Sequence, residues 1–399
     1  MPLGLLAAGR ASKVGAWSGQ PPPANTTVSM FRGNPARTGE HPGPGPAAPL
    51  RALWMTRLGT AISSTPALAD GVLFVGSVGA ISMAGGALHA VDARTGEELW
   101  RLQTAMGDAL FASPAVVDGV VYAASYDGIV IAARAESGEE LWRFQAEGAV
   151  YSSPVVWNHA VALGDASGRF YCLDASTGDE LWRFGSDDPY RRSFNASPAA
   201  DDSIFFVVAS AQYAGDQPIL HALDTETGEE RWRFVAPPGS RVRSATCVAS
   251  NRVHALTAEG SLHALEAGDG AEVWRYDAAG EVRTLPALAG GSLYLIAGPT
   301  PHRLHVIDAN TGTAQSVFDV GGEAEIVASP TVAQGIVYFG DQDGRLYAVD
   351  GQSGQERWHA GVGSLISTPV VVNGAVYIGS EQGELRAIGG SLKPDLPPS

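Results

Sequence analysis

Residues 88–100 read Leu-His-Ala-Val-Asp-Ala-Arg-Thr-Gly-Glu-Glu-Leu-Trp, and variants of this phrase recur along the chain. Clear copies cover 170–182, 220–232, 262–274 and 346–358, and weaker ones cover 130–142 and 304–316. The turn glycine of the phrase stands at Gly96, Gly138, Gly178, Gly228, Gly270, Gly312 and Gly354, which gives intervals of 42, 40, 50, 42, 42 and 42 residues. Spacing this regular predicts a structural unit that repeats along the chain.

Each unit carries the signals of four short strands. A proline-containing start, such as Ala-Ser-Pro-Ala-Val-Val over 112–117, is followed by a dipeptide such as Asp118-Gly119, a strong hairpin signal. An apolar second strand and a Gly-containing turn lead to the repeated phrase. In most copies its Asp-x-x-Thr-Gly turn joins a third strand to a fourth, because the Asp side chain can accept from turn amides and the Gly tolerates positive φ.

No helical periodicity interrupts these units, and their strands are apolar along most of their length. Such strands are typical of a β-propeller, in which neighbouring blades cover both faces of each sheet. First strands begin near Pro66, Pro114, Pro154, Pro198, Thr246, Pro286, Pro330 and Pro369, which predicts eight blades. The eighth unit has no fourth strand after 385–388, whereas an unassigned strand lies at 53–55. We therefore expect an all-β, eight-bladed propeller of four-stranded antiparallel blades, closed by an N-terminal strand that completes the last blade.

The composition agrees with one folded domain. Of 399 residues, 45% are hydrophobic and 17% charged, which excludes disorder for most of the chain. We expect a flexible Pro/Gly-rich arm over 1–45, a single propeller over 46–390 and a tail over 391–399. No apolar run reaches the length of a membrane span, and the first residues show neither a clear signal peptide nor a lipobox.

The charge and the motifs exclude several functions. A net charge of −16 disfavours nucleic acid as a partner. Phosphate-binding, nucleophile-elbow and zinc-protease motifs do not occur, and no carboxylates have calcium-loop spacing. Cys172 and Cys247 are expected to be buried small residues. The repeated histidines, His89, His221, His263 and His305, are expected to pack between strands, so no metal site is predicted.

The repeated tryptophans are interpreted as structural, since they occupy one position in successive units. They are Trp54, Trp100, Trp142, Trp182, Trp232, Trp274 and Trp358. Unit six has Ser316 at this position, so its junction with the next blade is expected to be the weakest.

The phrases Leu-His-Ala-Leu-Asp-x-x-Thr-Gly-Glu-x-x-Trp-Arg-Phe and Ser-Pro-x-x-x-x-Gly-x-x-Tyr resemble pyrroloquinoline-quinone (PQQ)-like repeats. The stretch Met-Phe-Arg-Gly-Asn-Pro-Ala-Arg-Thr-Gly over 30–39 resembles the lead-in before such propellers. The resemblance covers residues 30–390. It implies a fold shared by quinoprotein dehydrogenases, BamB-like outer-membrane assembly factors and sensor domains of kinases, and it favours a periplasmic or extracytoplasmic location. PQQ with calcium is not expected, because the resemblance implies adjacent cysteines against the quinone and Cys172 and Cys247 are 75 positions apart.

Departures from the repeat mark the candidate site. Insertions at 77–86, 186–194 and 210–218 fall in loops that share one face of a propeller, which suggests recognition there. Residues three positions before each first-strand Pro or Thr should surround the mouth of the central funnel. In ring order they are Ser63, Phe111, Tyr151, Asn195, Arg243, Arg283, Val327 and Ile366. The candidate binding residues are therefore Phe111, Tyr151, Arg191, Arg192, Asn195, Arg243 and Arg283; the arginines suggest a carboxylate, a phosphate or an acidic peptide.

The sequence favours a non-catalytic, monomeric binding or scaffold propeller that recognises a protein or peptide through this face, by resemblance BamB-like. The alternatives are an enzyme that uses the funnel, either quinoprotein dehydrogenase-like or a lyase or cyclase, and a ligand-sensing domain.

Overall fold

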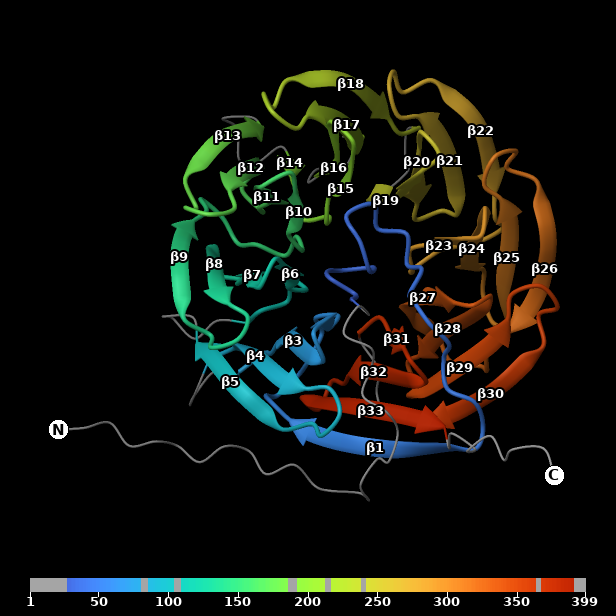
Figure 1. Cartoon of the computed structure of the whole chain (residues 1–399). Helices are drawn as coiled ribbons and strands as arrows, with labels where there is room; N and C mark the ends of the chain where they lie inside the picture. The colour runs from blue at the N-terminus through green and yellow to red at the C-terminus, as the bar shows by residue number, and fades with distance from the viewer. Residues whose placement is uncertain are drawn as a thin grey trace, which may run out of the picture.

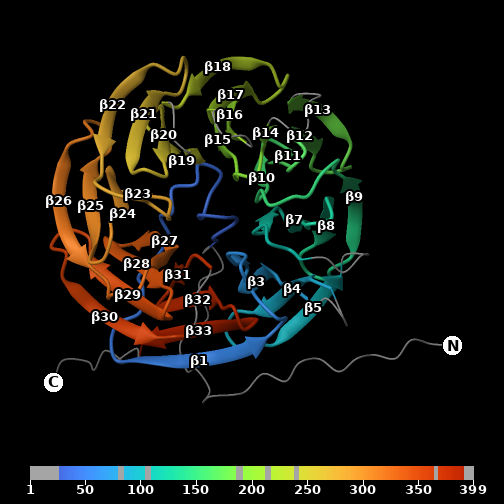
Figure 2. The same ribbon diagram turned by 180° about the vertical axis from the view of Figure 1, so that it is seen from behind.

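The computed structural model describes residues 27–79, 85–103, 109–185, 192–211, 217–237, 242–363 and 367–390. For residue 211 and residues 242–246 it describes the backbone alone. Eight antiparallel sheets stand around a common centre, as Figures 1 and 2 show from opposite sides. The expected eight-bladed β-propeller is confirmed.

Each blade is described here from its inner to its outer strand. Blades 1 to 4 contain β2 (Ala67–Ala69), β3 (Val72–Gly76), β4 (Ala87–Asp92) and β5 (Glu98–Gln103); β6 (Ala115–Val117), β7 (Val120–Ala124), β8 (Ile129–Arg134) and β9 (Glu140–Gln145); β10 (Val155–Trp157), β11 (Ala160–Gly164), β12 (Arg169–Asp174) and β13 (Glu180–Gly185); and β15 (Ala199–Asp201), β16 (Ile204–Ala211), β17 (Ile219–Asp224) and β18 (Glu230–Val235). Blade 4 has an additional short strand, β14 (Arg192–Ser193), which pairs with the end of β16.

Blades 5 to 8 follow the same order. They contain β19 (Val242–Ala249), β20 (Arg252–Thr257), β21 (Ser261–Glu266) and β22 (Glu272–Asp277); β23 (Ala287–Ala289), β24 (Ser292–Ala297), β25 (His302–Asp308) and β26 (Ala314–Val320); β27 (Ile326–Ala333), β28 (Ile336–Asp341), β29 (Arg345–Asp350) and β30 (Glu356–Gly361); and β31 (Val370–Val372), β32 (Ala375–Gly379), β33 (Glu384–Gly390) and β1 (Leu50–Arg57).

The N-terminal strand closes the ring as expected. Strand β1 pairs antiparallel with β33, from Leu50 opposite Gly390 to Arg57 opposite Glu384. Figure 1 shows β1 in blue as the outermost strand beside the red β33. Because both ends of the propeller share one sheet, the ring has no open junction.

The repeated tryptophans join adjacent blades. The Trp100 indole donates from Nε1 to the carbonyl oxygen of Ala135 at 2.9 Å, and its ring lies against Gly138 of the next blade. A side chain at Gly138 would collide with this ring. Equivalent indole–carbonyl bonds run from Trp54 to Ala93, Trp142 to Ala175, Trp182 to Thr225, Trp232 to Ala267 and Trp274 to Ala309.

The junction between blades 6 and 7 uses a different ring. Ser316 stands at the tryptophan position, opposite Val306, as the sequence indicates. However, Phe318 lies two residues further on the same strand and packs against Gly354 of blade 7. The junction therefore keeps an aromatic contact with the turn glycine, which the sequence comparison by position did not reveal.

Residues 27–46, named here the central segment, run through the middle of the ring (Figures 1 and 2). This differs from the flexible arm expected over 1–45, of which residues 1–26 lie outside the described part. The sequence resembled a linker because the segment forms no regular strand or helix. It is held instead by one or two backbone hydrogen bonds at each of several blades.

These bonds occupy the inner edges of seven blades. The last residue but one of the innermost strand donates its amide to the central segment in each case. In the order of blades 1, 2, 4, 5, 6, 7 and 8, the donors are Leu68, Val116, Ala200, Val248, Leu288, Val332 and Val371, and the acceptors are the carbonyls of Val28, Ser29, Pro35, Ala36, Thr38 and Gly39 and the ring of His41. These bonds give partners to amides that the edge of an inner strand would otherwise leave unpaired. As the residue number of the central segment increases, the bonds proceed around the ring from blade 1 to blade 8.

Two buried arginines strengthen the central segment. Arg37 donates to the carbonyl oxygens of Pro198 at 2.8 Å and of Ser153 and Pro154 at 3.1 and 3.0 Å, which ties it to blades 3 and 4. Arg32 donates to the carbonyl of Pro286 at blade 6. Burial lowers the pKa of Arg37 to about 9 and that of Arg32 to about 10. Both therefore stay charged at neutral pH, with backbone carbonyls as acceptors.

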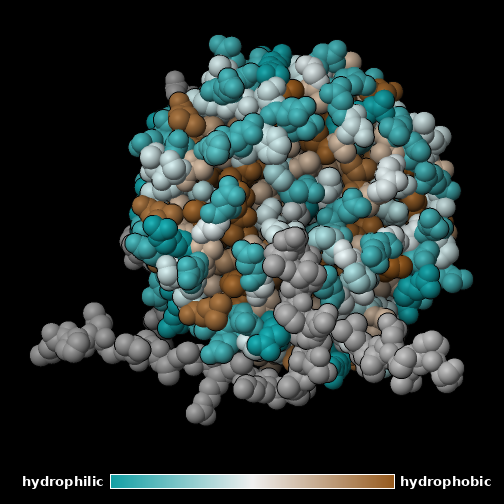
Figure 3. Space-filling model, viewed as in Figure 1, coloured by the Kyte–Doolittle hydropathy of each residue, from teal (hydrophilic) through white to brown (hydrophobic). Residues whose placement is uncertain are grey.

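Hydrophilic side chains cover most of the rim on the side shown in Figure 3, with small apolar groups between them. Within the described residues, no helix has the length and hydropathy that a membrane span needs.

Candidate functional site

Two kinds of connection meet on one side of the ring, named here the loop face. They are the connections that enter each innermost strand and the turns between the second and third strands of each blade. Parts of the insertions at 77–86, 186–194 and 210–218 lie outside the described residues. Of the insertions, the structure describes β14, which pairs through Arg192 with Ala211 and through Ser193 with Ser210.

An exposed aromatic cluster stands on the loop face at blades 2 and 3. It consists of Phe111, Tyr126 and Tyr151, which are 38%, 42% and 41% exposed. The rings of Phe111 and Tyr151 are stacked with centroids 5.9 Å apart, and Tyr126 meets them edge-on at 6.1 and 5.5 Å. Partial burial and a hydrogen bond with Tyr126 raise the pKa of Tyr151 above its usual value. Mutual packing thus fixes three aromatic faces that remain open to solvent.

Sequence reasoning selected Phe111 and Tyr151 but missed Tyr126. Tyr126 belongs to the turn between β7 and β8, which meets the connection carrying Phe111. The corresponding turn residues of other blades are Ala166, Ala258, Gln342 and Glu381. An aromatic residue at a position otherwise small or polar was the signal that could have identified it.

Blade 4 contributes Arg192 and Asn195. Arg192 donates from Nη1 to the carbonyl oxygen of Gln217 at 2.7 Å, so part of its guanidinium is used to hold the adjacent loop. The Asn195 amide lies 3.3 Å from the Ser193 hydroxyl and its side chain is exposed. Arg191 lies outside the described residues. Arg243 is placed in β19, but its side chain is not described.

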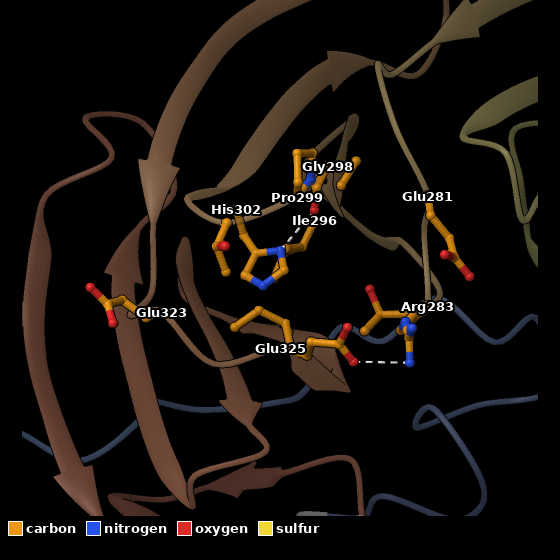
Figure 4. Close-up of a pocket in the computed structure, with 12 residues that line it drawn as sticks. Glu281, Arg283, Ile296, Gly298, Pro299, His302, Glu323 and Glu325 are labelled. Atoms are coloured by element: carbon orange, nitrogen blue, oxygen red, sulfur yellow. Dashed lines mark hydrogen bonds and ion pairs between the residues drawn. The ribbon is translucent and has the colours of Figure 1, made fainter.

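Arg283 lines a cavity of about 470 Å³ at the blade 6 and 7 side of the loop face (Figure 4). Its Nη1 lies 2.9 Å from Oε2 of Glu325, and Glu281 and Glu323 also line the cavity. Three carboxylates and one guanidinium line this cavity, so its lining carries a net negative charge. Glu323 and Glu325 come from the next connection along the ring and bring acidic groups to the cavity that Arg283 lines. The positive sector as a whole stays a prediction, since Arg191 and the side chain of Arg243 are not described.

The cysteines lie in different blades. Cys172 is in β12 and Cys247 in β19, and both are buried thiols that form no disulfide. The pair of adjacent cysteines implied by the quinoprotein resemblance is thus not formed, so the residues present do not fit that way of holding PQQ. Among the described residues, no three His, Cys, Asp or Glu side chains are grouped as metal ligands.

The repeated histidines form cross-strand pairs. His89 lies 2.8 Å from Glu98, and His221 makes the same pair with Glu230 at 2.5 Å. His305 lies 2.8 Å from the Tyr276 hydroxyl. All three histidines are buried, so these residues contribute to packing.

A family model described as outer membrane protein assembly factor BamB matches residues 51–183, 84–212, 166–261 and 215–391. The chain belongs to this family of PQQ-like repeat propellers. The overlapping matches cover the propeller described above and agree with the repeat seen in the sequence.

Solved structures share the family fold at low identity. A europium-containing methanol dehydrogenase has 15% identity and a TM-score of 0.74, with 91% of this chain and 98% of that chain covered. BamB from Moraxella catarrhalis has 18% identity and a TM-score of 0.69, with 88% and 100% covered. Quinohemoprotein alcohol dehydrogenase from Comamonas testosteroni has 17% identity and a TM-score of 0.74, with 94% and 82% covered. None of the curated proteins matches by sequence. At these identities the likeness concerns the fold.

Proposed function

We propose that this propeller is a non-catalytic binding module that recognises a protein or peptide through the loop face. The aromatic cluster of Phe111, Tyr126 and Tyr151 is the observation that carries the proposal. Exposed, clustered aromatic residues are enriched in protein interfaces, where rigid rings bury a large area at little cost in conformational entropy. Their preformed packing supports a site that is ready before the partner arrives.

The central segment supports a binding role over chemistry on the axis. The middle of the ring holds the chain's own residues (Figures 1 and 2), including the buried Arg32 and Arg37. Their acceptors are structural carbonyls. This occupancy of the centre supports recognition at the rim of the loop face.

A scaffold role in outer-membrane protein assembly is the specific form of this proposal. It rests on the family description and on the likeness to BamB. The protein, expressed with an affinity tag in its source cells, should co-purify from envelope fractions with an identified outer-membrane assembly protein. Loss of that protein in a Tyr126→Ala/Tyr151→Ala variant would connect the role to the aromatic cluster; its absence from the wild-type sample would remove the role.

A funnel enzyme is the second candidate, and the dehydrogenases among the solved relatives favour it. The wide separation of Cys172 and Cys247 speaks against a quinone held between adjacent cysteines. Reconstitution with PQQ and calcium, followed by a dye-linked alcohol oxidation assay, tests this candidate. Stoichiometric uptake of PQQ together with alcohol oxidation would favour the enzyme over the binding module.

Selection from a random peptide library displayed on phage tests the binding module itself. The purified wild type should enrich a related set of peptides. Tyr126→Ala/Tyr151→Ala should not enrich that set, since it lacks two of the three rings. Equal enrichment by both proteins would contradict recognition through this cluster.

A further inference from the structure

A separate cavity lies at the junction between blades 7 and 8, on the side of the ring opposite the loop face. At the other seven junctions of the described ring, a glycine in the turn between the third and fourth strands of one blade covers an aromatic ring of the blade before it. In blade 8 the third strand β33 and the fourth strand β1 lie at opposite ends of the described chain, so no turn joins them. Residues 44–48 pass this place instead and line a cavity of about 350 Å³.

The walls of this cavity are mostly apolar. They include Pro44, Pro46, the half-buried Ile336 and the indole of Trp358. The indole is fixed by its bond from Nε1 to the carbonyl oxygen of Pro46 at 3.0 Å, and its ring centroid lies 5.8 Å from that of Tyr338. The volume lies at the lower end of the range of roughly 300–1,000 Å³ common for ligand pockets. The cavity therefore suits an apolar group of about the size of one ring.

The hydroxyl of Tyr338 gives an independent sign of a ligand. Tyr338 lines the cavity and is 2% exposed, yet its hydroxyl makes no hydrogen bond with any described residue. In contrast, Tyr122 at the same repeat position of blade 2 donates to the carbonyl oxygen of Ala175 at 3.1 Å. Burial raises the pKa of Tyr338 to about 12, so the hydroxyl keeps its proton at neutral pH. A buried hydroxyl without a partner costs free energy, which an acceptor on a ligand would recover.

The charge of the lining favours an anion. The described lining holds one charged residue, Arg357, and no carboxylate. Asp350 accepts from Nη2 of Arg357, whereas Nε and Nη1 make no hydrogen bond with the described residues. The other oxygen of Asp350 accepts from two backbone amides of its own turn, so this carboxylate is already well solvated by the protein. The guanidinium thus keeps donors for a second acceptor, and guanidinium groups bind carboxylates well.

From this combination we propose that the cavity binds a carboxylate that carries an apolar group of about the size of one ring. Arg357 pairs with the carboxylate, the Tyr338 hydroxyl donates to one of its oxygens, and the apolar walls pack against the rest of the ligand. The carboxylate comes either from a free small acid or from the C-terminus of a peptide that ends in an apolar residue. The inference stands apart from the proposed function, because the aromatic cluster belongs to blades 2 and 3 and this cavity to blades 7 and 8.

Calorimetric titration of the purified full chain at low ionic strength tests the proposal. The probes are phenylacetate and hexanoate as free acids, and acetyl-Gly-Phe with a free C-terminal carboxylate as a peptide. We expect saturable binding of at least one probe at a single site, and an affinity about tenfold lower in Arg357→Gln, which loses a charge-assisted hydrogen bond. Tyr338→Phe keeps the ring and loses only the unpaired hydroxyl. It should bind the probe about threefold or more weakly and keep the wild-type melting temperature.

Amides of the same probes separate the role of the carboxylate from that of the apolar group. Phenylacetamide and acetyl-Gly-Phe-amide should bind about tenfold more weakly than the corresponding acids, because they carry no charge for Arg357. Stronger binding of phenylacetate or hexanoate than of acetyl-Gly-Phe indicates a free acid as the ligand. Stronger binding of acetyl-Gly-Phe indicates the C-terminus of a peptide.

The repeat supplies a matched control variant. Arg231 is the equivalent arginine of blade 4, where both Nε and Nη2 donate to Asp224. Arg231→Gln should bind the probe as the wild type does, and so should Tyr126→Ala/Tyr151→Ala, whatever happens to its peptide binding at the aromatic cluster. The proposal is overturned if no probe binds, if the amides bind as tightly as the acids, if Tyr338→Phe binds as the wild type does, or if Arg231→Gln weakens binding as much as Arg357→Gln.

Discussion

The indole of Trp358 donates from Nε1 to the carbonyl oxygen of Pro46, 3.0 Å away and 312 positions earlier in the chain. In six other blades the equivalent indole reaches the turn before the outer strand of the following blade. The eighth blade takes its outer strand from the N-terminal side, so the chain just before β1 supplies the acceptor. The N-terminal region thus closes the ring twice, by this bond and by the pairing of β1 with β33.

The central segment should be essential for stability, and glycine substitutions can measure this. Gly39 has φ of +73° and packs against Arg32 and Ala287, whereas Gly71 has a similar φ of +76° and open space around its Cα. Gly71→Ala should cost only the strain of positive φ, about 1–2 kcal/mol. Gly39→Ala should cost at least about 2 kcal/mol more in urea unfolding, since Arg32 must move. Equal losses of unfolding free energy in Gly39→Ala and Gly71→Ala would mean that the packing of the central segment contributes little to stability.

A second prediction concerns Phe318, whose ring takes the place of the tryptophan at the junction between blades 6 and 7. Phe318→Ala should lower the free energy of unfolding by about 2 kcal/mol, because it removes the half-buried ring that packs on Gly354. Ser316→Ala, at the tryptophan position, should change it by less than about 0.5 kcal/mol. Chemical denaturation measures the free energy of unfolding of both variants. A larger loss of this free energy in Ser316→Ala than in Phe318→Ala would contradict the claim that Phe318 stabilises the junction.

The sequence predicted the repeat and the closure, because each depends on a pattern. Seven complete units and one that lacks its fourth strand made the strand around Trp54 the only candidate for the last place. The central segment followed no pattern: residues 27–46 bond to the inner strands only at isolated positions, with one or two backbone hydrogen bonds at each. Its Pro- and Gly-rich stretch 42–46 therefore resembled a linker.

The candidate site was predictable only in part for a similar reason. Phe111 and Tyr151 occupy the same position in successive repeats, so a comparison of the repeats with one another identified them together. Tyr126 belongs to a different turn, and its approach to these rings needs three-dimensional information. Likewise, the position of Arg283 was foreseen, but its pairing with Glu325 from the next connection was not.

Acid should destabilise the propeller through buried histidines. Burial lowers the pKa of His41 to about 3 and that of His254 to about 4, against 6.5 in the unfolded chain. Below pH 6.5 the unfolded state therefore binds protons that the folded state does not. Stability is full above this value and falls as pH drops toward 4, by about 1.4 kcal/mol per pH unit for each such histidine.

Urea midpoints at pH 7.5, 6.0 and 5.0 check this prediction. His41→Asn should flatten the fall, because the amide oxygen of Asn can accept from the Val371 amide as the ring does at 3.1 Å. His359→Asn is the control, since His359 is exposed. If the urea midpoint of His41→Asn falls with pH as steeply as that of the wild type, His41 does not cause the loss of stability in acid.

The cysteines should be inert in the native protein. Both thiols are buried, and burial raises the pKa of Cys172 to about 12, so the reactive thiolate is scarce at neutral pH. Iodoacetamide at pH 7.5 should label neither thiol in folded protein and both in urea. Rapid labelling of the native state, read by intact mass, would show that these residues are accessible for chemistry.

Recognition through the aromatic cluster is tested most directly by the affinity of a peptide selected on the wild-type protein. The account predicts at least tenfold weaker binding to Tyr126→Ala/Tyr151→Ala, because aromatic anchors of this kind commonly contribute about 2 kcal/mol or more. Leu181→Ala, which removes another exposed apolar side chain on the outer strand β13, should bind as the wild type does. A double tyrosine variant that binds the peptide with wild-type affinity would contradict the central claim.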